Sequence, residues 1–198
     1  MQKVVITGHD LTVDQIIAVC REGAEVVLSD ESREKILASR QVVNELVEER
    51  KVVYGITTGF GKFSDVVISQ DECKLLQKNL IITHAVGAGD PFKEDIARGI
   101  LLLRVNSLSN GFSGICLETV ETMIAMLNKG VTPFIPEKGS LGASGDLAPL
   151  SHMVLPMIGL GMAWYKGELL PGAEAMERAG IPVLELSAKE GLALHNGT

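Results

Sequence analysis

The hydrophobic pattern of this chain changes near residue 65, and that change limits the fold more than any other feature. Before it, short apolar runs at residues 3–6, 25–28 and 52–54 have the length of strands and alternate with helical segments. After it, apolar residues recur almost throughout at helical spacing. The sequence therefore predicts a mostly α-helical protein, with a small N-terminal α+β portion (1–64) followed by a helical bundle segment (65–198).

Capping signals and breakers predict where individual elements begin and end. Helix starts are predicted at Thr12-x-x-Gln15, at Asp30 or Ser32, at Ser69-x-x-Glu72, at Asp90-Pro91 and at Ser187-x-x-Glu190. A further helix is expected over residues 113–128, ended by Gly130. Residues 147–165 carry no Asp, Glu, Lys or Arg and predict a helix buried on all sides, and residues 164–169 resemble a hairpin with Lys166-Gly167 at its turn.

Composition excludes several classes of function. The 198 residues include 18 basic and 25 acidic side chains, and a net charge of −7 argues against a nucleic-acid or anionic-membrane surface. Prolines and glycines within residues 147–165 argue against a membrane span there. Three widely spaced cysteines without a C-x-x-C pair indicate reduced thiols in a cytoplasmic protein, and no metal site.

The segment Ala143-Ser144-Gly145 carries the most specific chemistry in the chain. Gly145 has no Cβ, so its amide nitrogen can approach the Ala143 carbonyl carbon closely. The Ser144 hydroxyl can leave as water. Ring closure and elimination together lose two waters and give a 4-methylidene-imidazole-5-one ring, an electrophile that no ordinary side chain matches.

Three other interpretations of this segment were weighed. Stretches rich in Gly and Ser are usually ordinary turns, which is the simplest alternative. A nucleophile elbow requires G-x-S-x-G, and here the second glycine comes one place early. Phosphate loops require other glycine spacings or a following lysine, and neither is present.

Five blocks of sequence together resemble the histidine and aromatic amino-acid ammonia-lyases, whose prosthetic group is this ring. They lie at residues 54–61, 83–89, 102–108, 139–152 and 191–198, in the family's order. The resemblance implies a carbon–nitrogen lyase that eliminates ammonia from L-histidine to give urocanate, using the ring formed from residues 143–145 and neither metal nor nucleotide. It also implies a homotetramer. Because family members are much longer, the chain is expected to be an N-terminal part of such an enzyme.

The resemblance also assigns roles to single residues. Tyr54 matches the family's base, and Gly61, Thr83, His84 and Asn196 match positions at the substrate. An imidazole at position 84 could hydrogen-bond the imidazole of the substrate. Taken alone, Tyr54 is more typical of packing at a strand end, and His84 of a core histidine.

Asp146 directly follows the ring-forming residues and is a good helix N-cap by residue type. It would place the ring at a helix N-terminus, which favours developing negative charge. Arg104 also fits the family pattern, where structural pairing is the more favoured role. Two alternatives stay open: a tyrosine or phenylalanine ammonia-lyase or aminomutase of the same family, and, for this chain alone, a non-catalytic fragment.

Overall fold

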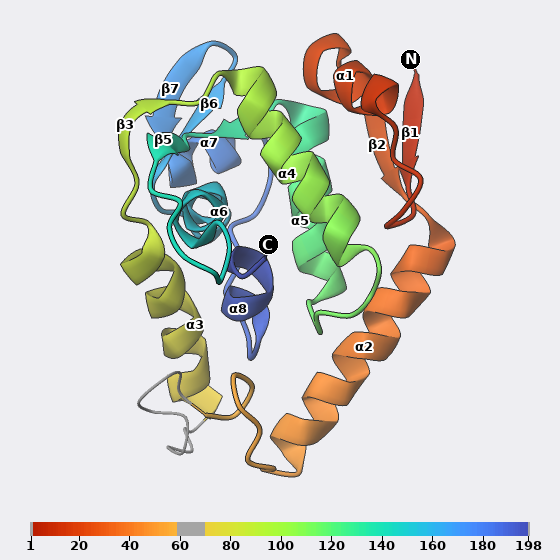
Figure 1. The fold of residues 1–198 in the computed structure, drawn as a ribbon, viewed down its shortest axis with the longest axis vertical. Coiled ribbons are helices and arrows are strands. Elements are labelled where there is room, and N and C mark those ends of the chain that lie inside the picture. The colour runs from red at the N-terminus through yellow and green to blue at the C-terminus, as the bar shows by residue number, and fades with distance from the viewer. Residues whose placement is uncertain (1, 59–69, 198) are drawn as a thin grey trace.

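The computed structural model describes residues 2–58 and 70–197 of the chain (Figure 1). Its first part contains β1 (Lys3–Ile6), α1 (Val13–Glu22), β2 (Glu25–Leu28) and α2 (Asp30–Glu48). Then follow α3 (Gln70–His84), β3 (Ala88–Pro91), α4 (Glu94–Leu108), α5 (Leu117–Lys129), β4 (Val131–Pro133) and β5 (Pro136–Lys138). The last part contains α6 (Leu147–Val154), the 3-10 helix η2 (Leu155–Ile158), β6 (Met162–Tyr165), β7 (Glu168–Pro171), α7 (Gly172–Arg178) and α8 (Glu190–His195).

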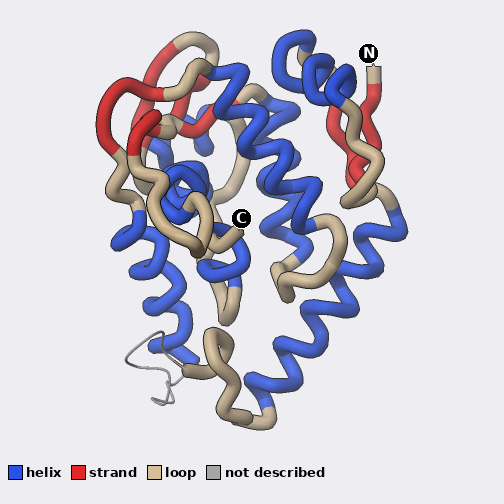
Figure 2. The backbone as a smooth tube through the Cα atoms, in the orientation of Figure 1, coloured by secondary structure: helices blue, strands red, loops and turns tan. Residues whose placement is uncertain are grey.

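Helices dominate and the strands are short, so the predicted fold class is confirmed (Figure 2). Helices α4 and α5 pack on each other across the middle of the molecule (Figure 1). On one side of them lie α1 and the parallel pair β1–β2, and on the other lie α3, α6 and α8. One hydrophobic cluster runs from Val4 and Ile36 through Leu101 and Met123 to Leu194. The boundary between the two expected portions, near residue 65, lies outside the described residues, so that division stays a prediction.

The N-terminal elements follow mainly from local signals. The capping box at Thr12 is confirmed, since the Thr12 hydroxyl accepts the Gln15 amide and the Gln15 side chain accepts the Thr12 amide. Helix α2 begins at Asp30, one of its two predicted starts, and its N-cap is Ser29, whose hydroxyl accepts the amide of Ser32 at 3.1 Å. Ser69, which opens the second predicted box, lies outside the described residues.

Two expected elements were wrong. Residues 52–54 form no strand, because the Val53 amide donates to the Thr57 hydroxyl and the Val53 carbonyl accepts the Ile56 amide, and Tyr54 begins a turn. At Asp90-Pro91 the chain stays extended as β3, which pairs antiparallel with β5, and the Phe92 amide continues the pairing by donating to the Ile135 carbonyl at 2.9 Å. Helix α4 therefore begins only at Glu94.

The single buried helix expected over residues 147–165 is divided into three elements. Helix α6 passes into η2, which carries Pro156 in its first turn and ends at Gly159, a left-handed C-cap with φ 75°. The chain then reverses into β6, which pairs with β4 and β7. The predicted hairpin turn is confirmed, since Lys166 and Gly167 both have positive φ as a type I′ turn requires.

Among the described residues, no helix is long and apolar enough to cross a membrane.

Candidate active site

The loop over residues 139–146 lies against the C-terminal end of the described chain. Gly145 forms an isolated parallel bridge with Gly197, and the Asp146 amide donates to the Gly197 carbonyl at 3.3 Å. These contacts place Asn196 one residue away from the bridge to the ring-forming segment. Two blocks some fifty residues apart in the sequence are thus joined through their main chains.

The ring-forming residues lie in a glycine-rich turn. Ala143 and Ser144 form a turn, and their side chains are exposed. Gly142 and Gly145, on either side, have φ of 94° and 92°, a region that side chains other than glycine rarely adopt. A Cβ at Gly142 would meet nothing within 4 Å. The residues present therefore fit the methylidene-imidazolone group, with Ala143, Ser144 and Gly145 supplying its atoms.

Asp146 occupies the N-cap position of α6, as predicted, but its carboxylate makes no capping hydrogen bond to the helix amides. It instead accepts a hydrogen bond from the Ser140 hydroxyl across the loop. The loop is therefore closed on itself by a side-chain contact, and the first amides of α6 are left without a cap from this carboxylate.

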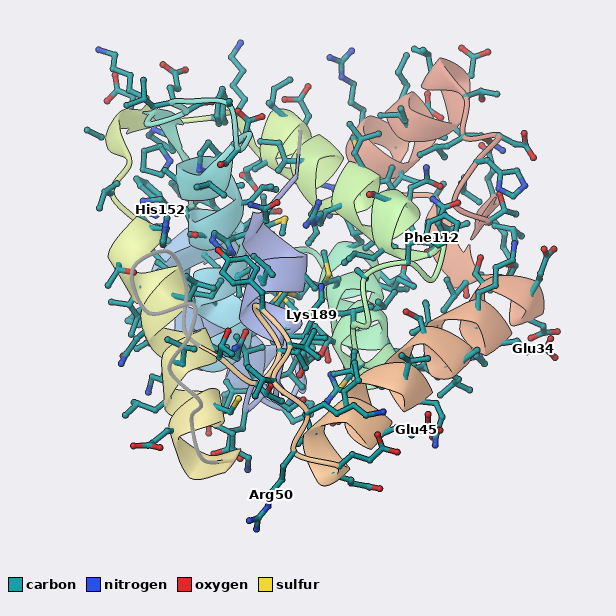
Figure 3. All side chains as sticks on the ribbon, turned by 60° about the horizontal axis from the view of Figure 1, so that its bottom comes forward. Glu34, Glu45, Arg50, Phe112, His152 and Lys189 are labelled. Atoms are coloured by element: carbon teal, nitrogen blue, oxygen red, sulfur yellow. The ribbon has the colours of Figure 1, made fainter. Side chains whose placement is uncertain are left out.

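The block over residues 83–89 meets the loop at its beginning. The Gly87 amide donates to Nε2 of His152 at 3.0 Å, and burial lowers the pKa of His152. Figure 3 labels His152, which belongs to α6. A Cβ at Gly139 would come within 3.0 Å of the Gly87 Cα. The segment that follows α3 is thereby held against both the loop and α6.

His84, at the end of α3, lies beside His195 of α8. Their ring centroids are 4.9 Å apart, and the ring planes are inclined by 56°. Each ring donates its Nδ1–H to a carbonyl four residues earlier: His84 to Leu80 at 2.8 Å, and His195 to Gly191 at 2.6 Å. Burial lowers the pKa of His195 to about 4, and electrostatic interaction with His84 and Arg104 acts in the same direction.

Arg104 of α4 connects the block over residues 102–108 to this group. Its Nη2 donates to the Ala193 carbonyl and, at 2.7 Å, to the Asn196 carbonyl. Burial lowers the pKa of Arg104. A Cβ on Gly197 would overlap the Arg104 guanidinium, so the guanidinium would have to move to admit a side chain at this position. Nη2 therefore pairs with two main-chain carbonyls, in line with the structural role expected of Arg104, while its buried Nε has no hydrogen-bond partner.

Of the remaining predicted site residues, Thr83 lies next to His84, with its Oγ1 3.3 Å from His84 Nδ1. Thr83 is exposed, and its hydroxyl donates to the Asn79 carbonyl of its own helix at 2.8 Å. Tyr54 is 59% exposed in the turn over residues 54–57. The contacts described above do not include Tyr54, so its catalytic place stays a prediction. Gly61 lies outside the described residues.

Sequence reasoning missed two residues of this group. These are His195 and Gln77, to which the sequence assigned no role. Gln77 and His84 are seven residues apart, which is two helical turns, so they share one face of α3. The Gln77 Oε1 accepts the Gly191 amide of α8 at 2.9 Å. The spacing of Gln77 and His84 by two helical turns was the signal in the sequence that one face of α3 is polar and contacts another helix.

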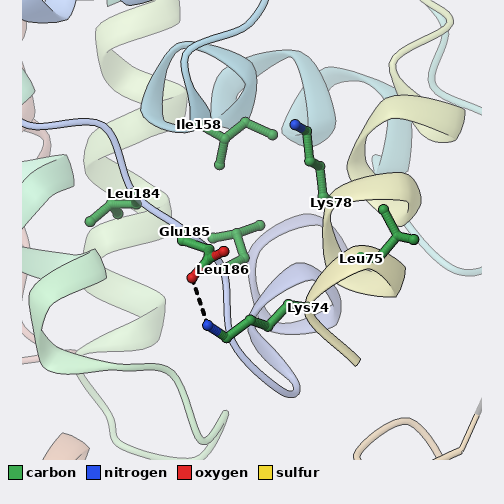
Figure 4. A pocket seen from close by; sticks show the side chains of 7 residues that line it. All are labelled: Lys74, Leu75, Lys78, Ile158, Leu184, Glu185 and Leu186. Carbon is green, nitrogen blue, oxygen red and sulfur yellow. Dashed lines mark hydrogen bonds and ion pairs between the residues drawn. The ribbon is translucent and has the colours of Figure 1, made fainter. Parts of the chain in front are cut away.

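A cavity elsewhere contains none of the predicted site residues. It lies between α3 and residues 184–186, near Ile158, and Lys74 and Glu185 form an ion pair of 2.6 Å at its edge (Figure 4). Within the described part of the chain, no group of three or more His, Cys, Asp or Glu side chains is arranged to hold a metal ion.

Comparison with known proteins supports the grouping of these blocks. The chain is 62% identical to histidine ammonia-lyase of Caldanaerobacter subterraneus subsp. tengcongensis, over 198 residues that make up 39% of that protein. It matches the structure of histidine ammonia-lyase from Trypanosoma cruzi with a TM-score of 0.92 and 40% identity, covering all of this chain and 38% of that one. It matches Pantoea agglomerans phenylalanine aminomutase with a TM-score of 0.91 and 38% identity, again over 100% and 38% of the two chains.

The chain therefore spans about two fifths of the length of these relatives. The model of the aromatic amino acid lyase family matches residues 11–198. Since this match includes nearly every residue, the chain belongs to the aromatic amino acid lyase family.

Proposed function

We propose that this chain carries the prosthetic-group loop and part of the substrate site of a histidine ammonia-lyase, which converts L-histidine to urocanate and ammonia. The observation that carries the proposal is the convergence of three blocks. The loop over residues 139–146 contacts the segment after His84 through Gly87 and the segment containing Asn196 through Gly197. The high identity to a histidine ammonia-lyase supports histidine as the substrate.

The prosthetic group is proposed to be 4-methylidene-imidazole-5-one, formed from Ala143, Ser144 and Gly145. It would supply an electrophilic carbon that makes the substrate's α-amino group a better leaving group. The first amides of α6 point toward this end of the loop and favour negative charge developing there. Tyr54 is proposed as the base that takes the β-proton, and Asn196 and Gly61 as residues at the substrate.

His84 is proposed to read the substrate's ring. Because its Nδ1–H is donated to Leu80, a neutral His84 keeps Nε2 as a hydrogen-bond acceptor. An N–H of the substrate imidazole is a matching donor, whereas a phenyl ring has none. Thr83, whose hydroxyl is bound to its own helix, is proposed to support this end of α3.

The alternative function within the family is that of an ammonia-lyase or aminomutase acting on tyrosine or phenylalanine. The structural match to phenylalanine aminomutase supports this alternative. A panel of L-histidine, L-tyrosine and L-phenylalanine, assayed on the complete protein that carries this chain, separates the two. Release of urocanate from L-histidine is expected, with Ser144→Ala as the inactive control. Turnover of tyrosine without histidine would contradict the assignment.

A second proposal concerns the 198-residue chain alone, which we propose to be non-catalytic. Its support is that the chain spans about two fifths of its relatives and that the contacts described here assemble only part of a site. Urocanate absorbance after mixing the purified chain with L-histidine tests this, and steady turnover would refute it.

A homotetramer in the cytoplasm is proposed for the complete protein, and the free thiols of Cys20, Cys73 and Cys116 support a reducing compartment.

A further inference from the structure

The pair formed by His84 and His195 is not explained by the proposed roles of the site residues. His195 is almost fully buried, with 2% of its surface exposed, and it lies directly before Asn196. Its ring lies 4.9 Å from that of His84, tilted by 56°. A buried imidazole carries two polar nitrogens into the protein interior, so an aliphatic side chain would fill this position with less desolvation.

Both rings are held in one tautomer by the same local contact. A carbonyl oxygen can only accept, so the Nδ1 atoms of His84 and His195 are the donors to Leu80 and Gly191. When neutral, each ring therefore keeps Nε2 as an acceptor. The charged group that faces the pair is the guanidinium of Arg104, whose Nη2 is bound to two main-chain carbonyls.

The position of His195 relative to α3 is fixed by a polar contact one turn earlier. Gln77 Oε1 accepts the amides of Gly191 at 2.9 Å and Leu192 at 3.4 Å. Gly191 has no side chain here because a Cβ would come within 2.8 Å of the Gln77 carbonyl oxygen. Helices α3 and α8 are thus in close contact at Gln77–Gly191 and again, two turns along α3, at His84–His195.

We propose that His195 is a positioning residue: its ring packs against His84 and holds that imidazole in the orientation in which Nε2 is presented to the substrate's ring. The inference rests on the proposed function, in which His84 reads the substrate. It deepens that proposal, because it assigns part of the ring selectivity to a residue that does not itself contact the substrate. A half-buried histidine without such a neighbour would lose rotamer entropy on binding a ligand.

The test uses the four histidines of the chain, whose ring ¹⁵N shifts report the tautomer of each imidazole by NMR. In the wild type, His84 is expected to show one dominant tautomer with Nδ1 protonated. His195→Leu removes the planar ring, so the His84 ring is expected to rotate away from the Leu80 carbonyl for part of the time, and its signals to shift toward a mixture of tautomers. His195→Phe keeps a ring without the nitrogens, and it is expected to preserve the wild-type His84 signals. His9→Leu, at an exposed position, is the matched control and should change nothing.

Binding of L-histidine provides the second measurement on the same samples. In His195→Leu the dissociation constant is expected to rise by about two- to tenfold, the range that corresponds to one neutral hydrogen bond. His195→Phe is expected to bind nearly as the wild type does, and circular dichroism checks that each variant is folded. Unchanged His84 signals in a folded His195→Leu variant would overturn the inference.

The two proposals fail in different ways. If the chain and the complete protein bind no L-histidine, the proposed function fails, yet the His84 signals still show whether His195 orients that ring. If L-histidine binds equally well to the wild type and to His195→Leu, the positioning role fails and the proposed function stands.

Discussion

The main-chain amide of Asp146 donates a hydrogen bond to the carbonyl of Gly197, 3.3 Å away. Through this contact the residue that follows the ring-forming segment is tied to the residue that follows Asn196. The same Gly197 lies against the guanidinium of Arg104. A change at any of these residues is therefore expected to alter the loop as well as the end of α8.

Replacing Gly197 by Ala tests how tightly Gly197 packs against Arg104. The new Cβ would overlap the Arg104 guanidinium, so a loss of about 1–3 kcal/mol in the free energy of unfolding is expected. Gly99→Ala is the matched control, because a Cβ there would meet only the Cys20 Sγ at 3.9 Å within helix α4. Gly99→Ala should stabilise the chain by about 0.5–1 kcal/mol. Urea unfolding measures the stability of both variants. Equal changes in the free energy of unfolding would contradict the close packing of Gly197 against Arg104.

Arg104→Lys tests whether the guanidinium is required for structure. Lysine keeps the charge but lacks the planar group that reaches two carbonyls, so a loss of about 1–3 kcal/mol is expected. Arg21→Lys, which alters an exposed ion pair with Asp95, should change stability by less than about 1 kcal/mol. Thermal or urea unfolding of the two variants provides the comparison. A change at Arg104 no larger than that at Arg21 would show that the two carbonyl contacts contribute little.

The lowered pKa of His195 predicts a specific pH dependence of stability. The folded pKa of about 4 lies below the ordinary value near 6.5, so the unfolded chain binds the additional proton in this window. Stability is therefore present in full above about pH 6.5 and is lost as the pH falls toward 4, by up to about 3 kcal/mol from this group. Burial of His152 acts in the same direction.

The contribution of His195 is isolated by comparing the wild type with His195→Phe, which cannot titrate. The difference between their unfolding free energies should change between pH 6.5 and 4 and be constant above pH 7. Parallel pH profiles for the two proteins would show that the His195 pKa is not lowered by burial.

His84→Leu tests the selectivity assigned to α3. The substrate imidazole would lose its acceptor, and KM for L-histidine in the complete protein should rise by about tenfold or more. Thr83→Ser is the control, since it keeps the hydroxyl that bonds to the Asn79 carbonyl. Steady-state kinetics with L-histidine and L-phenylalanine measure the effect. If activity with L-histidine and with L-phenylalanine fell equally, His84 would affect the site in general and would not select the ring of the substrate.

Elements that depend on neighbouring residues were predictable from the sequence. The Thr12 capping box, the left-handed cap at Gly23 and the Lys166-Gly167 turn each depend on residues within a few positions. Helix α8 was expected to open at Ser187, but it begins only at Glu190, with Lys189 as its N-cap. One half of the predicted capping box is present, because the buried Glu190 carboxylate accepts the Ser187 amide at 2.9 Å. The other half is absent, because the Ser187 hydroxyl donates to that same carboxylate, also at 2.9 Å.

Features that depend on distant partners were not predictable in this way. Residues 88–91 form a strand because residues 136–138 pair with them, and no local pattern near Asp90 indicates that partner. The contact between His84 and His195 likewise joins positions 111 residues apart. The sequence resemblance identified which blocks belong to the site, whereas the main-chain contacts of Gly87, Gly145 and Gly197 depend on the packing of α3, α6 and α8.

Intact mass of the purified chain, with a peptide map across residues 139–152, tests the central claim most directly. The loss of two waters, located at Ala143-Ser144-Gly145, is the predicted result, and Ser144→Ala should keep the full mass. A wild-type mass without that loss, in a chain shown to be folded, would contradict the claim that this loop builds the electrophile.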